Sequence, residues 1–454
     1  MKKIISIILA SIVVIYFVIA YNVQNNTSAY LKYKRYIPQN IKKHIRSTFT
    51  KINTLYIYKK SNFSFEKKKN IKLTSFKSNN DLYVFNNPNL IFTGPRAYFA
   101  SNTNNLFLIT GTGILLYTPK NTLNVNDEKI DFKKIPNNFE EVFKNYRHKD
   151  RFYTFTSMVK SMIYKGDSLY VSTVQKYNDT CFTHVIYKGL LNFKKTNFEE
   201  FYKFKKCKPY YTDYLGGTIA HFKNDKILFT VGDWNICEDE RWTLNIETKG
   251  FCTKNSGQNL DNDLGKIFEI DIIKKERKIL SIGHDNPQGI FYDKKNKILF
   301  STEHGPQGGD EININRTPIS TDIKNYGYPI SSYGEHYGFP SPSVEYKYIE
   351  APLYKSHEKY GFKEPIDYFV PSIGISDVAK YKNKLIVASL GSEIEQGDLS
   401  LYIYTLDENQ NIIKKEINKI HQRIRDIHLI DDKIAVIFLE STGSIGIFKL
   451  KNLD

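Results

Sequence analysis

Two arginines near the end of the chain have the type and spacing to bind a carboxylate. Arg423 and Arg425 stand two residues apart in the stretch QRIRD. Residues two apart on a β-strand face the same side, so both guanidinium groups can point into one site. A planar guanidinium can form two parallel hydrogen bonds to a carboxylate, which suits an anionic ligand. Taken alone, the same R-x-R pattern is also typical of a solvated strand face.

The densest group of polar residues and glycines runs from Gly283 to Pro329. It contains GHDNPQG, then an apolar run, then EHGPQGGDE, and it ends in KNYGYP. Two histidines, His221 and His284, fall in a predicted strand and a predicted loop, and we expect both to be structural.

The four cysteines bear on the compartment of the protein. None of them forms a CxxC pair, so a zinc site is not expected. An even number beyond an apolar N-terminal segment suits an oxidising compartment, and three pairings are possible. Proximity in the sequence favours Cys181 with Cys207 and Cys237 with Cys252. The alternative is four unpaired, buried thiols in a cytosolic protein.

Hairpins that recur along the chain must position these residues. Each has a few apolar or aromatic residues, a tip of Gly, Asn, Asp or Lys, and a second apolar run, which indicates a β-hairpin. The six segments begin at Ala97, Ser161, Thr218, Gly289, Asp377 and Asp426. Their spacing leaves room for two more strands in each unit, which predicts an all-β fold, a six-bladed β-propeller. In this fold we expect the chemistry in loops at one end of a central channel.

Composition and charge restrict the class of protein. The 454 residues are 41% hydrophobic and 25% charged, which excludes wholesale disorder and a polytopic membrane protein. Residues 21–75 carry +12 of the net charge of +17, from thirteen Lys or Arg against the single acid Glu66. The remaining chain is nearly neutral, so we expect no nucleic-acid partner.

The N-terminus predicts attachment to a membrane. An uncharged run from Ile4 to Tyr21 lies at the lower limit of what spans a bilayer and is long for a signal peptide. We expect an anchor at residues 1–21, with a cleaved signal as the alternative. A basic stalk at residues 22–75, against anionic lipid or as a solvated linker, would precede the propeller at residues 76–454. The protein would then be anchored in the inner membrane and face the periplasm, or be secreted to the periplasm if the segment is cleaved.

The motifs from Gly283 onward resemble those of the glucose/sorbosone dehydrogenase family, the soluble aldose dehydrogenases that use pyrroloquinoline quinone (PQQ). The family's GHRNPQG, EHGP, GGDE-N and NYGWP are matched here by GHDNPQG, EHGPQGGDEIN and NYGYP. PSIGISD and QRIRD resemble its later segments, and the match runs in order from about Ala97 to Leu450. The resemblance implies a six-bladed propeller. It also implies oxidation of an aldose at C1 with PQQ and calcium, in which a histidine removes the hydroxyl proton.

The resemblance also assigns roles to single residues. Cofactor binding is implied for Asp213, Asn286, Arg423 and Arg425. Gly305 and Pro306 match a pair whose carbonyls hold a catalytic calcium ion. Glu311, by its carboxylate, and Tyr326, by its backbone, match a second, structural calcium site. Without the family, Glu311 would be read as a surface carboxylate.

Two positions depart from the family pattern. Tyr214 stands where the family has its catalytic histidine, and a phenol with a pKa near 10 is a poor base at neutral pH. Asp285 stands where the family has an arginine, and its charge would repel a cofactor carboxylate. The stretch Ser389-Leu-Gly also lacks a counterpart of the family's cofactor-binding lysine.

Three functions are compatible with this combination. The first is a membrane-tethered sugar dehydrogenase that uses PQQ and calcium, with Tyr214 at the catalytic position and an unidentified electron acceptor. The second is a propeller of the same family that lacks redox chemistry and binds a sugar, a glycan or a protein. The third is an enzyme for another substrate, in which Tyr214 has a new role.

Overall fold

The structure is a computed structural model. It describes residues 59–68, 70–74, 81–87, 90, 96–144, 158–177, 181–205, 215–234, 256–340 and 347–453, together with Pro38. The chain divides into two units, and the strands belong to the second, Ser61–Asp454. The fold is all-β, and the longest helix in these ranges, α4 (Phe139–Lys144), has 6 residues. No helix in them is long and apolar enough to cross a membrane, and the expected anchor at residues 1–21 lies outside them.

All six predicted hairpins are present as antiparallel strand pairs. They are β4 (Ala97–Ser101) with β5 (Asn105–Thr110), β8 (Val159–Lys165) with β9 (Ser168–Lys176), β12 (Gly216–His221) with β13 (Lys226–Val231), β16 (Asn286–Asp293) with β17 (Ile298–His304), β21 (Ile375–Tyr381) with β22 (Lys384–Ser389), and β25 (Ile424–Ile430) with β26 (Ile434–Leu439). Residues at their tips, such as Asn224, Lys382 and Asp431, have positive φ angles, as tight turns require.

Further strands complete four of the sheets. They are β10 (Phe182–Leu190) and β11 (Phe198–Lys203) after β9, β14 (Lys266–Asp271), β15 (Arg277–Ile282) and β19 (Lys324–Asn325) after β13, β18 (Asp310–Asn315) and β20 (Asp367–Phe369) after β17, and β23 (Ser400–Leu406) and β24 (Ile412–Lys419) after β22. Neighbouring sheets pack through shared apolar clusters; one of these holds Ile186, Phe229 and Phe268.

The fifth sheet joins the first hairpin to the last. It runs from β4 and β5 through β6 (Leu115–Pro119), β7 (Lys129–Ile135), β1 (Asn62–Lys67) and β3 (Asp81–Asn86) to β27 (Ser444–Lys449), β26 and β25. The short strand β2 (Ile71–Lys72) pairs with β3. Because β1 pairs with β7 and β3 pairs with β27, the N-terminal strands connect the two ends of the fold.

The strands β1 and β2 lie in the segment that we expected to be a stalk. Phe63 and Phe65 are fully buried and alternate with exposed residues, as on a strand with one face against the core. The folded unit therefore begins at Ser61, earlier than the expected boundary at residue 76.

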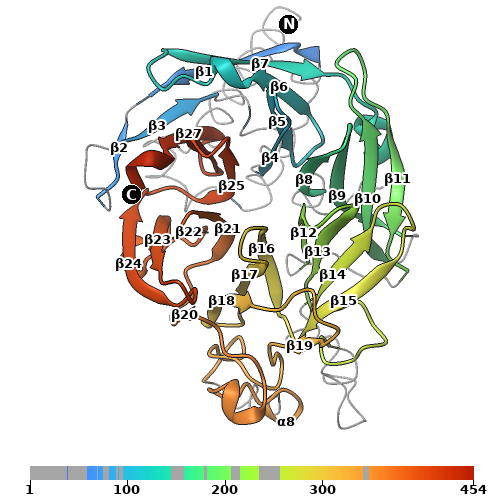
Figure 1. The fold of residues 1–454 in the computed structure, drawn as a ribbon, viewed down its shortest axis with the longest axis vertical. Coiled ribbons are helices and arrows are strands. Elements are labelled where there is room, and N and C mark those ends of the chain that lie inside the picture. Colours follow the sequence, from blue (N-terminus) through green and yellow to red (C-terminus); the bar gives the residue numbers. More distant parts are fainter. Residues whose placement is uncertain are drawn as a thin grey trace, which may run out of the picture. The chain divides into compact units, whose positions relative to one another are not determined.

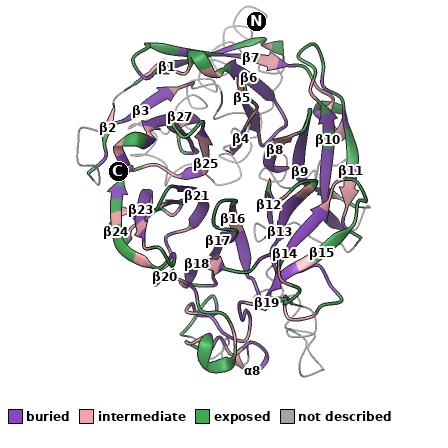
Figure 2. Cartoon of the chain, in the orientation of Figure 1, coloured by how far each residue is buried: buried purple, intermediate pink, exposed green. Residues whose placement is uncertain are grey.

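The first strands of the hairpins form a ring. β4 lies beside β8, followed by β12, β16, β21 and β25, and β25 lies beside β4 again. Figure 1 shows these strands around a central opening, with the later strands of each sheet farther out. Figure 2 shows that the buried residues concentrate in the inner and middle strands. The fold is therefore of the propeller type, with the starts and ends of the first strands at the two ends of a channel.

Candidate functional site

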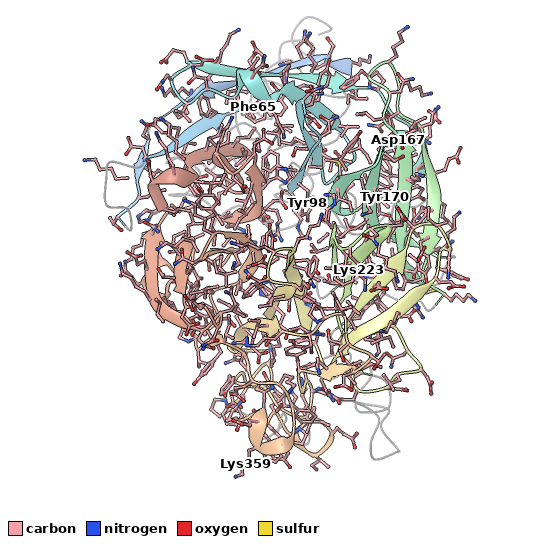
Figure 3. All side chains as sticks on the ribbon, viewed as in Figure 1. Phe65, Tyr98, Asp167, Tyr170, Lys223 and Lys359 are labelled. Atoms are coloured by element: carbon pink, nitrogen blue, oxygen red, sulfur yellow. The ribbon has the colours of Figure 1, made fainter. Side chains whose placement is uncertain are left out.

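A narrow pocket, which we call the mouth pocket, is lined by the starts of the first strands. Its walls include Arg96, Lys160, Gly216, Gln288, Ser376 and Arg425. Tyr98, which also lines it, projects toward the centre of the ring in Figure 3. The volume of about 20 Å³ means that this pocket can contact the edge of a ligand but cannot enclose one.

One side of the mouth pocket is positively charged. Arg425 belongs to β25, Arg96 directly precedes β4, and Lys160 belongs to β8. These three strands are consecutive in the ring, whereas the other three strands contribute glycine, glutamine, serine and the carboxyl group of Asp377. We call Arg96, Lys160 and Arg425 the cationic arc. Because these three cationic side chains lie on one side, they attract an anion to that part of the mouth pocket.

Arg423 and Arg425 meet on one carboxylate, that of Glu440. The Nε of Arg425 donates to Glu440 Oε2 at 2.6 Å, and the Nε of Arg423 donates to Oε1 at 3.0 Å. Burial raises the pKa of Glu440, but the charges of Arg425, Arg96 and Arg423 outweigh it and hold this pKa at about 2. Of the two predicted arginines, only Arg425 lines the mouth pocket, and Arg423 donates to the carbonyl of Leu390.

Two carboxyl groups, Asp377 and Asp426, lie between the mouth pocket and the channel and line both. Asp377 Oδ2 accepts from the backbone N–H of Ile427 at 2.8 Å, and Asp426 Oδ2 accepts from that of Phe99 at 2.7 Å. Burial raises the pKa of Asp377 to about 7. Burial and the charge of Asp377 raise the pKa of Asp426. The pair therefore carries less than two full charges at neutral pH.

The channel below this pair is a cavity of about 240 Å³ among all the first strands. Its walls are mostly apolar, with His221 and His428 as exceptions. Burial lowers the pKa of His221 to about 4 and that of His428 to about 3, so both rings are neutral at pH 7. His221 lines the cavity, and part of its surface is accessible. Protein surrounds the ring nevertheless, and this burial disfavours the charged form and lowers the pKa.

Asn286 and Asp285 are buried at the start of β16. Asn286 Oδ1 accepts from the backbone N–H of Gly216 at 3.0 Å, which ties β16 to β12. The backbone N–H of Asp285 donates to Glu303 Oε2 at 3.2 Å, and its side chain does not line the mouth pocket. Asp213 and Tyr214, which directly precede this part of β12 in the sequence, lie outside the described residues.

Gly305 and Pro306 form a buried turn after β17, at the end of the strand that pairs with the start of β16. The N–H of Gly305 donates to Asp310 Oδ1 at 3.3 Å. A Cβ atom at Gly305 would collide with the carbonyl of Gly309, so only glycine fits this turn. Among the described residues, no backbone N–H donates to the carbonyl oxygen of Gly305 or Pro306.

The second expected calcium site involves Glu311 in β18 and Tyr326 just after β19, both buried. The ring of Tyr326 stacks on His284, with centroids 4.7 Å apart. His284 is structural, as expected, because its ring nitrogens lie 2.8 Å from Ser281 Oγ and 3.1 Å from Glu303 Oε2. In the described ranges, no three His, Cys, Asp or Glu side chains are grouped so that they could hold a metal ion.

Arg96, Lys160 and Glu440 are site residues that the motifs in the sequence do not single out. The first two had a usable signal, because Arg96, Lys160 and Arg425 each directly precede the start of a predicted hairpin, at Ala97, Ser161 and Asp426. Equivalent positions in repeated units meet at one level of the channel. Glu440 follows β26 and had no such signal.

The chain is similar in sequence to known proteins. The family model described as Glucose / Sorbosone dehydrogenase matches residues 157–447. Aldose sugar dehydrogenase YliI of Escherichia coli is 29% identical over 182 residues, 37% of this chain and 43% of that protein. Quinoprotein glucose dehydrogenase B of Acinetobacter calcoaceticus is 26% identical over 145 residues, 29% of each chain.

Solved structures share the fold. A crystal structure of a glucose dehydrogenase matches with a TM-score of 0.56 at 18% identity, over 78% of this chain and 95% of that chain. The chain spans 60% or less of the length of the curated relatives it matches.

Proposed function

Because the chain belongs to the glucose/sorbosone dehydrogenase family, we propose that it oxidises an aldose sugar at C1 with PQQ and calcium. The observation that carries this proposal is the cationic arc, since PQQ bears three carboxylates and the arc presents three cationic side chains on one side of the mouth pocket. We also read the ring of hairpins as a six-bladed propeller. Each hairpin then supplies one blade's innermost strand.

The residues at the mouth fit the cofactor by charge. Arg425 would bind a cofactor carboxylate, with Arg96 and Lys160 on the same side. Glu440 holds Nε of Arg425 at 2.6 Å, which fixes the direction of the guanidinium. Gly305 and Pro306 would hold the catalytic calcium ion through their backbone carbonyls. When bound, PQQ accepts a hydride equivalent from the sugar while calcium polarises the quinone.

The proton acceptor is one part of the site in which this chain departs from its family. Tyr214 stands at the position of the histidine, next to Asp213. An unperturbed phenol removes a proton poorly at neutral pH. This single substitution favours a second candidate function, a propeller that binds a sugar, a glycan or a protein without redox chemistry.

An assay of the full chain separates these functions. The protein is loaded with PQQ and calcium, and aldoses are screened with an artificial dye as electron acceptor. The proposal predicts sugar-dependent dye reduction that requires PQQ and falls in Arg425→Ala. Binding of PQQ without turnover on any aldose would favour the second function. Absence of both binding and turnover would refute a quinone site.

We further propose that the protein faces the periplasm and is held at the inner membrane by residues 1–21. The disulfide bond of Cys181 supports an oxidising compartment; the other cysteines lie outside the described residues. Protease added to cells with a permeabilised outer membrane should digest the protein. Protection until the inner membrane is broken would contradict this location.

A further inference from the structure

The residues expected to hold the structural calcium ion, Glu311 and Tyr326, face a histidine. The Nε2 atom of His357 lies 3.0 Å from Glu311 Oε1, within ion-pair distance, and the ring lies close to the backbone of Tyr326. These are the two groups, a carboxylate and a backbone, that the family resemblance assigns to calcium. His357 is 1% exposed, so its ring lies inside the protein between them.

His357 and Glu311 make further polar contacts. His357 Nδ1 lies 2.9 Å from Ser331 Oγ, and Glu311 Oε2 accepts from Asn313 Nδ2 at 3.2 Å. Calcium takes six to eight oxygen ligands at about 2.3 to 2.6 Å. A carboxylate whose two oxygens already face nitrogen atoms does not offer that arrangement. The residues present therefore do not fit a calcium ion at this position.

The backbone around His357 is shaped for this side chain. Gly327 follows Tyr326 with φ of +96°, and a Cβ atom there would collide with Ser331 Oγ and lie 2.8 Å from His357 Nδ1. The backbone N–H of His357 donates to Glu364 Oε2 at 3.1 Å, which fixes the loop that carries the ring. The turn after β19 and the loop at residue 357 thus accommodate the imidazole from both sides.

We propose that His357 takes the place of the family's structural calcium ion, so that this part of the fold is held together without a metal. The ion-pair contact of the imidazole with Glu311, and its position against the backbone of Tyr326, do what the ion would do. They connect β18 to the turn after β19. This inference rests on membership of the family and not on the proposed oxidation of a sugar.

The test is thermal unfolding of the full chain without PQQ, in a calcium chelator and in calcium. We expect the melting temperature of the wild type to be the same in both, or to show a calcium effect that Glu311→Gln leaves unchanged. A calcium-dependent rise that Glu311→Gln abolishes would overturn the proposal. This comparison needs no variant of His357 and reads no enzyme activity, so a failed oxidation assay does not affect it.

Variants of His357 give a second readout. His357→Ala vacates the space between Glu311 and Tyr326, and we expect calcium to raise its melting temperature by about 3 °C or more. His336→Ala is the matched control, because His336 is also fully buried and its Nε2 lies 2.7 Å from the carbonyl of Ala351, away from Glu311. It should lose stability and gain nothing from calcium. Equal rescue of both variants would contradict a specific role for His357; if His357→Ala does not fold, the wild-type comparison decides.

Discussion

Arg425 and Arg423 share Glu440 but differ in what else they reach. Arg425 lines the mouth pocket, whereas Arg423 is directed to Glu440 and to the carbonyl of Leu390. Arg425→Ala should therefore weaken PQQ binding by about tenfold or more, the worth of one charge-assisted hydrogen bond. Arg423→Ala should weaken it less, because Arg425 keeps its contact with Glu440. Calorimetric titration of PQQ measures both, and an equal or reversed order would contradict this assignment.

Tyr214 limits the rate in the proposed reaction. A histidine at this position supplies a base with a pKa near neutrality, and a well-placed base contributes about 100-fold or more. Tyr214→His should therefore raise kcat for dye-linked sugar oxidation without tightening PQQ binding. Tyr211→His, three residues earlier in the same segment, serves as the control. A flat response to Tyr214→His would show that more than the base has been replaced.

The sequence was enough to predict some of these residues and not others. Arg423 and Arg425 are two residues apart, which is the spacing of one strand face, so the sequence predicts that they converge on one group. Glu440 was not, because its partners lie on another strand and its own neighbours contain no motif. Lys160 belongs to no motif of its own, and only the shared position before every hairpin predicts that it lies at the mouth.

The strands β21 and β25 bring Asp377 and Asp426 together, and this makes stability depend on pH. Both groups have a pKa above the ordinary value of 3.8, to about 7 for Asp377. Between about pH 4 and pH 7 the folded state then binds more protons than the unfolded state, so the free energy of unfolding falls as pH rises. Asp426→Asn keeps an acceptor for the N–H of Phe99 and removes one ionisable group.

As pH rises from about 5 to about 8, we expect the free energy of unfolding of Asp426→Asn to increase by about 1 to 2 kcal/mol relative to that of the wild type. Urea unfolding at both pH values measures the difference. The exposed Asp322→Asn should show no such trend, since its carboxylate lies at the surface. A difference between Asp426→Asn and wild type that does not change with pH would contradict the raised pKa values.

Strand β1 tests where the folded unit begins. Phe65 is fully buried, and its ring lies 5.1 Å from that of Phe132 on β7; Figure 3 labels it at the outer edge of the ring of sheets. Phe65→Ala should lower the free energy of unfolding by about 3 to 5 kcal/mol, while the exposed Glu66→Ala changes it by about 0.5 kcal/mol or less. If both substitutions change the free energy of unfolding only slightly, residues 62–67 belong to a linker and not to the folded unit.

Hairpins were easier to predict than this strand. Each hairpin is a local pattern of two apolar runs and a turn, which sequence alone contains. The alternation at Phe63 and Phe65 is short and is surrounded by lysines, so the sequence alone favours a basic stalk there. Its partners are distant, because β1 pairs with β7 and the neighbouring β3 pairs with β27 at the other end of the chain.

At the scale of the whole folded unit, closure of the ring positions the site. Asn86 Nδ2 donates to Ser444 Oγ at 2.8 Å across a separation of 358 residues, and Asp426 accepts from Phe99 across 327 residues. These contacts bring β25 beside β4, so Arg425 and Arg96 become neighbours. The cationic arc exists only in the closed ring, which is why no single stretch of sequence contains it.

Calorimetric titration of PQQ into the full chain in the presence of calcium is the decisive experiment for a quinone site. We expect saturable binding at one site per chain. We also expect binding to weaken in Arg425→Ala and to strengthen at lower salt, since the arc acts through charge. Absence of binding, or binding that Arg425→Ala leaves unchanged, would contradict a quinone site at the mouth of the ring.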